Sequence, residues 1–173
     1  MAVMLGSLAL VSCSADTKPL PTIVSTDEPG PRLTVEGRVL DAETGEPVEG
    51  ARLVVYQTDQ TGTYQNEDSA DETTARIRAE LTSGSNGEFG FVTVQPGEYP
   101  DQPPGNRHIH FHGVTAPGYA SKGFVLLFDD NVRSEVREWA ESTGFGIVVP
   151  VTGNPEGGFA TTIDIPLDPE ALP

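Results

Sequence analysis

The chain is poor in cysteine, in basic residues and in aromatic side chains. Its 173 residues include one cysteine, so no disulfide can form within the chain. Lys and Arg number 10 against 26 Asp and Glu, which gives a formal net charge of −16. Phosphate backbones and anionic lipid headgroups repel such a protein, so we expect no nucleic-acid partner and no direct binding to a membrane surface.

The apolar run near the N-terminus, AVMLGSLALV at residues 2–11, is too short to cross a bilayer as a helix. LVSC at residues 10–13 closes this run and resembles the lipobox of bacterial lipoproteins. The resemblance implies a signal peptide over residues 1–12, a lipid on Cys13, and an exported protein held at the outer side of the cytoplasmic membrane or at the cell surface. The alternative is an ordinary cleavable signal with an incidental cysteine, which predicts a secreted protein.

Residues 13–31 hold four prolines and little periodic pattern. This composition predicts an extended, semi-rigid tether. We therefore expect one folded domain over residues 32–173, a length that can bury one hydrophobic core.

Short alternating apolar runs, separated by turn residues, dominate this domain, and the chain holds 19 glycines and 15 prolines. The pattern GRVLDAETGEPVEGARLVVY within residues 33–59 predicts a hairpin and is typical of prealbumin-like sandwich modules. Further strands are expected over residues 87–94, 107–114, 122–128 and 157–167. Many short strands with turn signals predict an all-β chain folded as a prealbumin-like β-sandwich.

One short helix is expected near residues 131–143. Its apolar stripe, at helical spacing, consists of Val132, Val136, Trp139 and Ala140. Asp130 or Asn131 is the expected cap, and Gly144 is the expected end. Trp139 is expected to pack the helix onto a sheet.

All three histidines of the chain fall within residues 106–112 (NRHIHFH), at every second position. In a strand, residues i and i+2 point to the same face about 7 Å apart, so His108 and His110 project together while Ile109 and Phe111 enter the core. Two imidazoles at this spacing can hold one metal ion, and zinc bound by three histidines is the default site. A solvated row of histidines fits the same pattern.

The sequence around the histidines resembles the signature of the intradiol ring-cleavage dioxygenases. That signature joins a Gln-x-Asp and Gly-x-Tyr segment, a Pro-x-x-Tyr-Pro turn, a His-x-His-Phe strand and a following Pro-Gly-Tyr. The matching residues here are Gln57, Asp59, Gly62, Tyr64, Arg78, Thr82, Gly87, Phe89, Phe91, Thr93, Pro96, Gly97, Tyr99, Pro100, His108, His110, Phe111, Pro117, Gly118 and Tyr119. These separated elements occur in the family order across residues 34–168, which makes the resemblance specific.

The resemblance implies a non-haem Fe(III) ion held by Tyr64, Tyr99, His108 and His110. Phenolates suit this ion because a hard trivalent cation favours anionic oxygen, and two of them offset two of its three charges. The implied substrates are a catechol-type aromatic diol and O₂. The implied reaction breaks the ring between the two hydroxyl-bearing carbons and gives a cis,cis-muconate-type diacid. By the same analogy, Tyr99 leaves the ion and accepts a substrate proton.

Two positions depart from the family pattern. The family carries an arginine three residues before the first histidine and a glutamine on the strand after Pro-Gly-Tyr, where this chain has Gly105 and Val125. Arg78 and Arg107 are therefore the candidate catalytic arginines, with Arg76 as a further substitute. Arg107 directly precedes the first histidine and is expected to point to the opposite face of the strand.

Two other functions fit the same residues. One is a non-catalytic prealbumin-like module that binds a metal, a carbohydrate or a partner, since the sandwich pattern alone identifies a fold. The other is a zinc or copper protein that uses His108, His110 and His112. Tyr56 and Tyr119 are expected to be packing residues.

Overall fold

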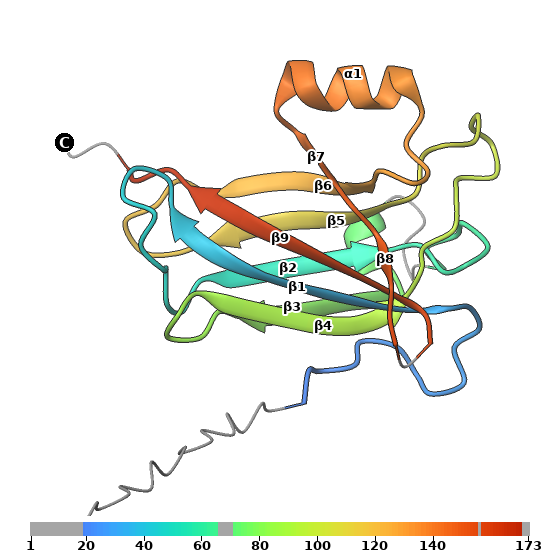
Figure 1. Ribbon diagram of the computed structural model, residues 1–173, viewed down its shortest axis with the longest axis horizontal. Coiled ribbons are helices and arrows are strands. Elements are labelled where there is room, and N and C mark those ends of the chain that lie inside the picture. The colour runs from blue at the N-terminus through green and yellow to red at the C-terminus, as the bar shows by residue number, and fades with distance from the viewer. Residues whose placement is uncertain (1–18, 66–70, 156, 171–173) are drawn as a thin grey trace, which may run out of the picture.

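Two β-sheets packed face to face form the body of the chain, and one helix lies outside them (Figure 1). The computed structural model describes residues 19–65, 71–155 and 157–170; the predicted signal peptide and Cys13 lie outside these residues. The elements are β1 (Arg32–Asp41), β2 (Arg52–Gln57), the 3-10 helix η1 (Glu72–Thr74), β3 (Ile77–Thr82), β4 (Glu88–Val94), β5 (His108–Thr115), β6 (Lys122–Phe128), α1 (Ser134–Thr143), β7 (Gly146–Val149), β8 (Thr152–Gly153) and β9 (Phe159–Leu167).

Both sheets are mixed in strand direction. One has the order β4-β1-β9-β8 and the other the order β3-β2-β5-β6-β7. Neighbouring strands run antiparallel except β1 with β9 and β6 with β7, which run parallel. This architecture confirms the predicted all-β sandwich with one short helix. The finer prealbumin-like assignment stays a prediction.

The hairpin predicted over residues 33–59 is wrong. β1 pairs with β4 and β9, whereas β2 pairs with β3 and β5, so the two strands lie in different sheets. Val35 on β1 and Val55 on β2 are both fully buried, because each strand points its apolar side chains into the shared core from one side. A hairpin shows the same alternation, so the local pattern does not distinguish the two arrangements.

Strand β5 separates the core from the functional face. Ile109 and Phe111 are fully buried between the sheets, and Phe111 stacks on Phe124 with ring centroids 4.7 Å apart. Burial of each such side chain contributes about 1.5–3 kcal/mol. The intervening His108 and His110 therefore project from the outer face of the five-stranded sheet, as the alternation predicts.

Helix α1 covers the same outer face next to the histidine strand. It packs on β6 and β7 through Val125, Leu127 and Ala140 (Figure 1). It ends at Gly144, whose φ of 66° is a left-handed conformation that suits glycine, as predicted.

The predicted cap of this helix is wrong. The N-cap is Arg133, which makes no side-chain capping hydrogen bond. The Asn131 side chain is used elsewhere, because it accepts the backbone N–H of Arg107 at 2.9 Å and donates to Glu98 at 2.6 Å. Asp130 forms an ion pair with Arg107 instead of a cap.

The predicted packing of Trp139 onto the sheet is also wrong. Its side chain is 42% exposed, and its ring lies 6.0 Å from the ring of Phe145 at the surface. Ala140 is the buried residue of the helix, and each residue is turned about 100° from the one before it. Within the described part of the chain, no helix combines the length and the apolar character that a membrane span requires.

Residues 19–31 pack on the domain, which departs from the extended, semi-rigid tether that the sequence predicts for this stretch. Thr22 pairs with Val92 on the free edge of β4, and the N–H of Ile23 donates to the Val92 carbonyl at 2.9 Å. Glu28 is buried in a contact with Arg76. This part of the segment therefore belongs to the domain.

Candidate metal centre

Four side chains from three segments of the chain meet on the outer face of the five-stranded sheet. The hydroxyl of Tyr64 lies 2.9 Å from Nε2 of His110, and the hydroxyl of Tyr99 lies 3.1 Å from Nε2 of His108. The two Nε2 atoms are 3.0 Å apart, and the two hydroxyls hydrogen-bond to each other. The structure therefore brings together all four residues of the predicted ligand set.

Both sheets contribute to this cluster. β5 supplies His108 and His110, because the period of two in a strand places them on one face. Tyr64 follows β2 in the same sheet, whereas Tyr99 follows β4 in the other sheet. The centre thus depends on the packing of the whole sandwich and not on one local motif.

The backbone fixes the orientation of one imidazole. Nδ1 of His108 lies 2.6 Å from the carbonyl of Asn106, which can only accept, so Nδ1 carries the proton and Nε2 presents its lone pair. The Asn106 side chain also accepts the backbone N–H of Tyr99 at 2.9 Å. The ring of His110 stacks on Tyr56 with centroids 4.4 Å apart, which agrees with the packing role predicted for this tyrosine.

Burial keeps the four side chains neutral in the absence of a metal. It lowers the pKa of His110 to about 3 and also lowers the pKa of His108. It raises the pKa of Tyr64 and of Tyr99 above the ordinary 10.0. The imidazoles are thus ready to bind a metal without losing a proton, whereas the phenols need a strong Lewis acid to displace theirs.

The donor set fits a ferric ion. The donor atoms stand close enough together to bind one ion, since each hydroxyl lies 2.9 or 3.1 Å from the nearest imidazole nitrogen. Two phenolates would offset two of the three charges of a ferric ion, and exchange of one phenolate for a dianionic diol would bring the net charge to zero.

The alternative site of three histidines is not formed. His112 continues the row, but its ring lies beside Tyr56 with centroids 6.1 Å apart. Across residues 19–65, 71–155 and 157–170, no three His, Cys, Asp or Glu side chains are placed to hold a metal. The zinc or copper hypothesis therefore lacks its ligand set.

Two glycines allow the tyrosine loops to touch backbone to backbone. A Cβ at Gly62 would lie 1.8 Å from the Glu98 carbonyl oxygen, and one at Gly97 would lie 2.4 Å from the Gly62 nitrogen. The N–H of Gly97 donates to the Asp59 carbonyl at 2.7 Å and closes the contact. The glycines of the two tyrosine motifs therefore let the two tyrosine loops pack closely against each other.

The Gln-x-Asp motif anchors the same loops. Gln57 is fully buried; it donates to the Val94 carbonyl at 2.8 Å and accepts from Thr93 at 3.0 Å, which ties β2 to β4 across the sandwich. Asp59 accepts from the N–H and the hydroxyl of Thr61 at 2.8 and 2.6 Å. These hydrogen bonds hold the loop that carries the first tyrosine of the cluster.

Of the two candidate catalytic arginines, the structure brings Arg78 to the site face. The Cα of Arg78 pairs with that of Tyr56, which pairs with that of His110, so the three form one row across the sheet. Two strand spacings place Arg78 about 10 Å from His110 at Cα, within the combined reach of an arginine and a bound substrate. Arg107 lies on the opposite face, as its place in the strand predicts, and its guanidinium pairs with Asp130 at 3.1 Å.

The two residues that depart from the family pattern, Gly105 and Val125, both have close neighbours in the structure. Gly105 has a φ of 89°, and a Cβ there would lie 2.8 Å from the Arg133 Cβ and 2.9 Å from the Asn131 carbonyl oxygen, so an arginine fits only if the loop moves. Val125 pairs with His110 on the neighbouring strand and is buried under α1. It therefore presents an apolar wall where the family has an amide.

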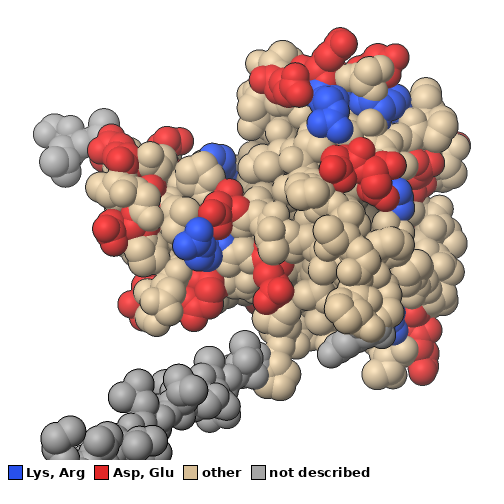
Figure 2. All heavy atoms as spheres, in the orientation of Figure 1, with Lys and Arg blue, Asp and Glu red and all other residues tan. Residues whose placement is uncertain are grey.

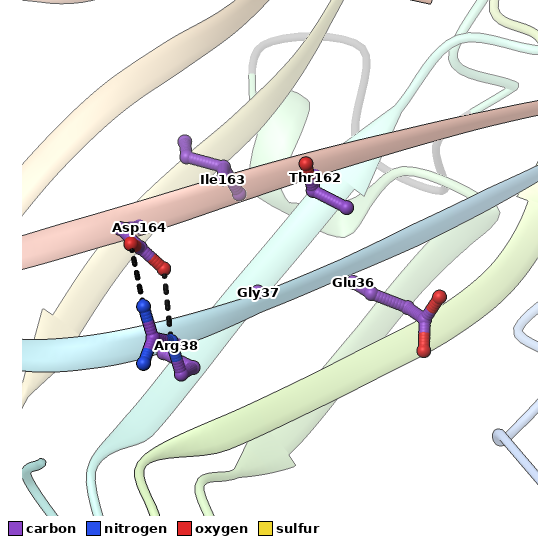
Figure 3. A pocket seen from close by; sticks show the side chains of 6 residues that line it. All are labelled: Glu36, Gly37, Arg38, Thr162, Ile163 and Asp164. Atoms are coloured by element: carbon purple, nitrogen blue, oxygen red, sulfur yellow. Dashed lines mark hydrogen bonds and ion pairs between the residues drawn. The ribbon is translucent and has the colours of Figure 1, made fainter. Parts of the chain in front are cut away.

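One hollow of the surface lies away from the four side chains. Figure 3 shows a depression on the outer face of the four-stranded sheet, over Gly37 and beside the ion pair of Arg38 with Asp164. This face is on the far side of the sandwich from the histidines. Figure 2 shows acidic side chains spread over the surface and gathered near α1, in keeping with the net charge of −16.

Comparisons with known proteins give one consistent family. A family model described as a dioxygenase matches residues 10–123. Hydroxyquinol 1,2-dioxygenase from Nocardioides simplex is 38% identical over 99 residues, which are 49% of this chain and 32% of that protein. Hydroxyquinol 1,2-dioxygenase from Rhizobium sp. (strain MTP-10005) is 31% identical over 126 residues, which are 65% of this chain and 41% of that protein. The chain thus spans about a third to two fifths of these curated relatives.

Solved structures agree with this result. The dioxygenase domain of a dioxygenase carbohydrate-binding protein fusion from Streptomyces sp. SirexAA-E has a TM-score of 0.68 at 26% identity, over 94% of this chain and 97% of that chain. Catechol 1,2-dioxygenase from Pseudomonas arvilla C-1 has a TM-score of 0.69 at 17% identity, over 90% of this chain and 60% of that chain, and supports the fold alone.

The fold and the cluster together define a β-sandwich protein with a centre of two tyrosines and two histidines. With the family match over residues 10–123, the chain belongs to the intradiol ring-cleavage dioxygenase family. The resemblance seen in the sequence motifs is thereby confirmed.

Sequence reasoning missed the residues that support the ligands. They are Glu28, Gln65, Glu98 and Asn106. Glu98 accepts from the Gly105 N–H at 2.8 Å and from the Asn131 side chain, and so holds the loop between Tyr99 and β5. Adjacency to a ligand motif was the one available signal for Gln65, Glu98 and Asn106. Glu28 carried no signal, because it lies in the proline-rich segment.

The buried carboxylate of Glu28 predicts an acid-sensitive fold. Hydrogen bonds from Arg76 hold its pKa below the ordinary 4.5, so the unfolded chain takes up a proton before the folded chain does. The stability that Glu28 contributes is fully present above about pH 4.5 and is lost as the pH falls through its lower folded pKa. In urea unfolding over a pH series, Glu28→Gln should flatten this acidic decline, and the exposed Glu49→Gln should keep the wild-type decline. Equal pH profiles for all three proteins would contradict the expectation.

Proposed function

We propose that this chain is a non-haem Fe(III) intradiol dioxygenase. It cleaves catechol-type rings between their two hydroxyl-bearing carbons with O₂ and gives cis,cis-muconate-type diacids. One observation carries the proposal: Tyr64, Tyr99, His108 and His110 present their donor atoms to one point. Family membership and relatives named hydroxyquinol 1,2-dioxygenase and catechol 1,2-dioxygenase support it. Bound ferric iron would supply a Lewis acid that a diol can chelate through its two oxygens and that would make the ring reactive toward O₂.

The residues of the chain hold the metal, orient the ring and take up a proton. His108 and His110 are neutral and aimed by the Asn106 carbonyl and the Tyr56 ring, so they hold the ion without rearrangement. Tyr99 is the proposed acceptor of one substrate proton, since a phenolate is a strong base and burial raises the pKa of Tyr99 further. Tyr64 would be the tyrosine that remains a ligand, by the same family analogy that makes Tyr99 the proton acceptor.

The neighbours of the cluster suit an aromatic ring. Tyr56 and Val125 flank His110 on its two sides in the sheet, and Val125 belongs to the apolar cluster under α1. Arg78 stands at the end of the same row and carries a positive charge on the site face. We assign to Arg78 the role of stabilising negative charge on the bound diol, in place of the family arginine that Gly105 replaces.

Metal uptake and product analysis test the function directly. Metal-free protein titrated with ferric iron should turn red-brown, because phenolate-to-ferric charge transfer absorbs visible light. The loaded protein should then consume O₂ with catechol or hydroxyquinol, and mass spectrometry should show a diacid that has gained both oxygen atoms. A protein that stays colourless with excess ferric iron would contradict the proposal.

Arg78→Ala should slow turnover without bleaching the protein. We expect kcat/KM for catechol to fall roughly 10-fold, less than for a buried oxyanion donor, because the guanidinium is partly in solvent. The charge-transfer band should stay unchanged, since Arg78 touches no ligand of the cluster. Arg107→Ala is the matched comparison, because this arginine lies on the opposite face and pairs with Asp130. A larger loss of kcat/KM in Arg107→Ala than in Arg78→Ala would reverse the assignment.

We also propose that Cys13 is lipid-modified and that the protein is exported and membrane-anchored. The proposal rests on the apolar run that ends in LVSC at residues 10–13. In a bacterial host, wild-type protein should incorporate labelled fatty acid and sediment with membranes, whereas Cys13→Ser should do neither. A wild-type protein that takes up no label would favour the secreted alternative.

A further inference from the structure

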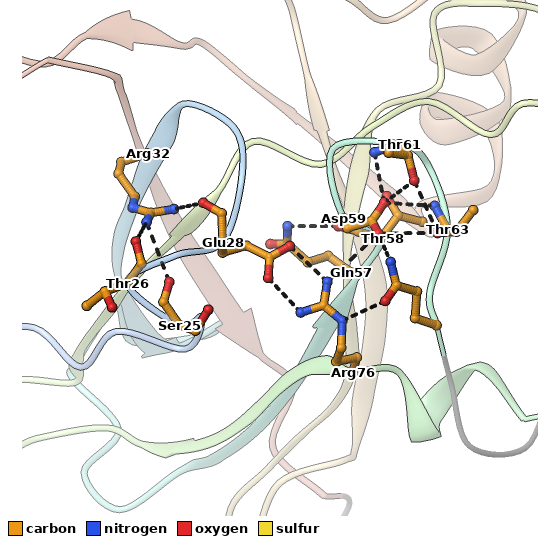
Figure 4. A network of polar contacts seen from close by, with 11 residues as sticks. Ser25, Thr26, Glu28, Arg32, Gln57, Thr58, Asp59, Thr61, Thr63 and Arg76 are labelled. Atoms are coloured by element: carbon orange, nitrogen blue, oxygen red, sulfur yellow. Dashed lines mark hydrogen bonds and ion pairs between the residues drawn. The ribbon is translucent and has the colours of Figure 1, made fainter.

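The segment that precedes β1 contacts residues that support the metal centre. Glu28 has a side chain that is 5% exposed, and it accepts two hydrogen bonds from Arg76, at 2.6 and 2.8 Å. Arg32 fixes the backbone of this segment, because it donates to the carbonyls of Glu28 and Thr26 at 3.0 and 2.8 Å (Figure 4). Arg32 therefore fixes the backbone around Glu28, and Arg76 binds the Glu28 carboxylate.

Arg76 also contacts the loop that carries Tyr64. Its backbone N–H donates to the carbonyl of Tyr64 at 3.0 Å, and its Nε donates to the side chain of Gln65 at 3.1 Å. Its guanidinium also lies 3.8 Å from the buried carboxylate of Asp59. One arginine thus binds the ligand residue itself, the residue after it and the anchor of the loop.

The backbone next to the ligand needs this support. Gln65 has a φ of 46°, a left-handed conformation that costs a non-glycine residue free energy unless its surroundings hold it. The Gln65 side chain is held at both ends, because its oxygen accepts from Arg76 and its nitrogen donates to Asp59. The direction of the Tyr64 phenol is therefore coupled to the Arg76 guanidinium.

We propose that Glu28 and Arg76 are positioning residues for Tyr64, so that residues 25–32 support the metal centre and are more than a connection to it. This inference rests on the proposed function. It predicts an asymmetric effect, because Tyr99 has separate anchors in Asn106 and the Glu98 loop. Loss of the Glu28–Arg76 pair should weaken the metal contact of Tyr64 and leave the Tyr99 side of the centre in place.

The test compares iron binding with stability in the full chain. In Glu28→Ala and Arg76→Ala, ferric affinity measured against a competing chelator should fall about 10- to 100-fold, as for outer residues that orient metal ligands. At saturating iron, the charge-transfer band should shift or weaken. Glu28→Gln keeps an acceptor for Arg76 and should restore part of both losses. Arg38→Ala is the matched control, because it removes a bidentate ion pair on the far side of the sandwich.

A second variant keeps the test decisive if the buried pair is needed for folding. Gln65→Asn retains a residue type that tolerates a left-handed backbone but is too short to span Arg76 and Asp59. It should fold and shift the band in the same direction as Glu28→Ala. If all these variants keep wild-type affinity and band while their unfolding free energy falls, the pair is only structural and the inference is overturned. A wild-type protein that takes up no ferric iron would instead overturn the proposed function.

Discussion

Replacing Tyr64 or Tyr99 with Phe is expected to bleach the ferric protein and abolish ring cleavage. Each change removes one anionic oxygen from a partly buried centre and leaves more of the charge of the ion uncompensated. Ferric affinity should fall by more than about 100-fold, since changes outside the ligand set already cost about 10- to 100-fold. Absorption during a ferric titration and O₂ uptake with catechol measure the two effects separately.

Tyr56→Phe is the matched control for both changes. Tyr56 is the nearest other tyrosine, and its ring stacks on His110 with an interplanar angle of 5°. Phenylalanine keeps this ring and loses only the hydroxyl, so the variant should keep the colour and the affinity of the wild type. A Tyr64→Phe variant with the full wild-type band would show that the hydroxyl does not bind the metal, and the enzyme proposal would fall with it.

The two halves of the ligand set were predicted from different signals in the sequence. The spacing of His108 and His110 follows from the period of a strand, and alternation with Ile109 and Phe111 showed which face was buried. No such rule relates Tyr64 or Tyr99 to the histidines, since they lie 44 to 46 and 9 to 11 residues away in the chain. For these two residues the family motifs, and not the periodicity, provided the prediction.

The errors arose where a local pattern has more than one tertiary solution. β1 and β2 alternate as a hairpin does, but each also fits a strand that faces the other across a sandwich core. The predicted helical stripe includes two adjacent residues, Trp139 and Ala140, which cannot both face the sheet. The smaller side chain, that of Ala140, is buried against the sheet, and Trp139 is exposed. Gly146 confirms this, because a Cβ there would lie 2.5 Å from the Ala140 Cβ.

The residues that support the metal centre could not be predicted from the sequence, for a different reason. Glu28 lies 48 residues before Arg76, and the prolines around it give no periodic signal. Its role depends on a long-range ion pair that only the folded chain reveals. Composition predicted an extended tether over residues 13–31, but from residue 19 on the backbone bends, turns at residues 26–27 and packs on the domain.

Gly62→Ala is expected to separate the two tyrosine loops. The new Cβ would lie 1.8 Å from the Glu98 carbonyl oxygen, so one backbone must move, and a φ of 82° adds strain for any residue with a side chain. Strain of about 1 kcal/mol together with overpacking of about 1–3 kcal/mol should lower the unfolding free energy by roughly 2–4 kcal/mol. Ferric affinity should fall as well, because the two displaced loops carry Tyr64 and Tyr99.

Gly45→Ala is the control for Gly62→Ala, because it introduces the backbone strain without the close contact. Gly45 has a similar φ of 74° but has nothing within 4 Å of an added Cβ, so this variant carries the strain without the collision. It should lose only about 1 kcal/mol and keep wild-type ferric affinity. The difference between the two variants, measured by urea unfolding and ferric titration, therefore reports what the loop contact contributes. Equal values for both variants would show that the loops tolerate a methyl group between them, and that the spacing of the phenols is set elsewhere.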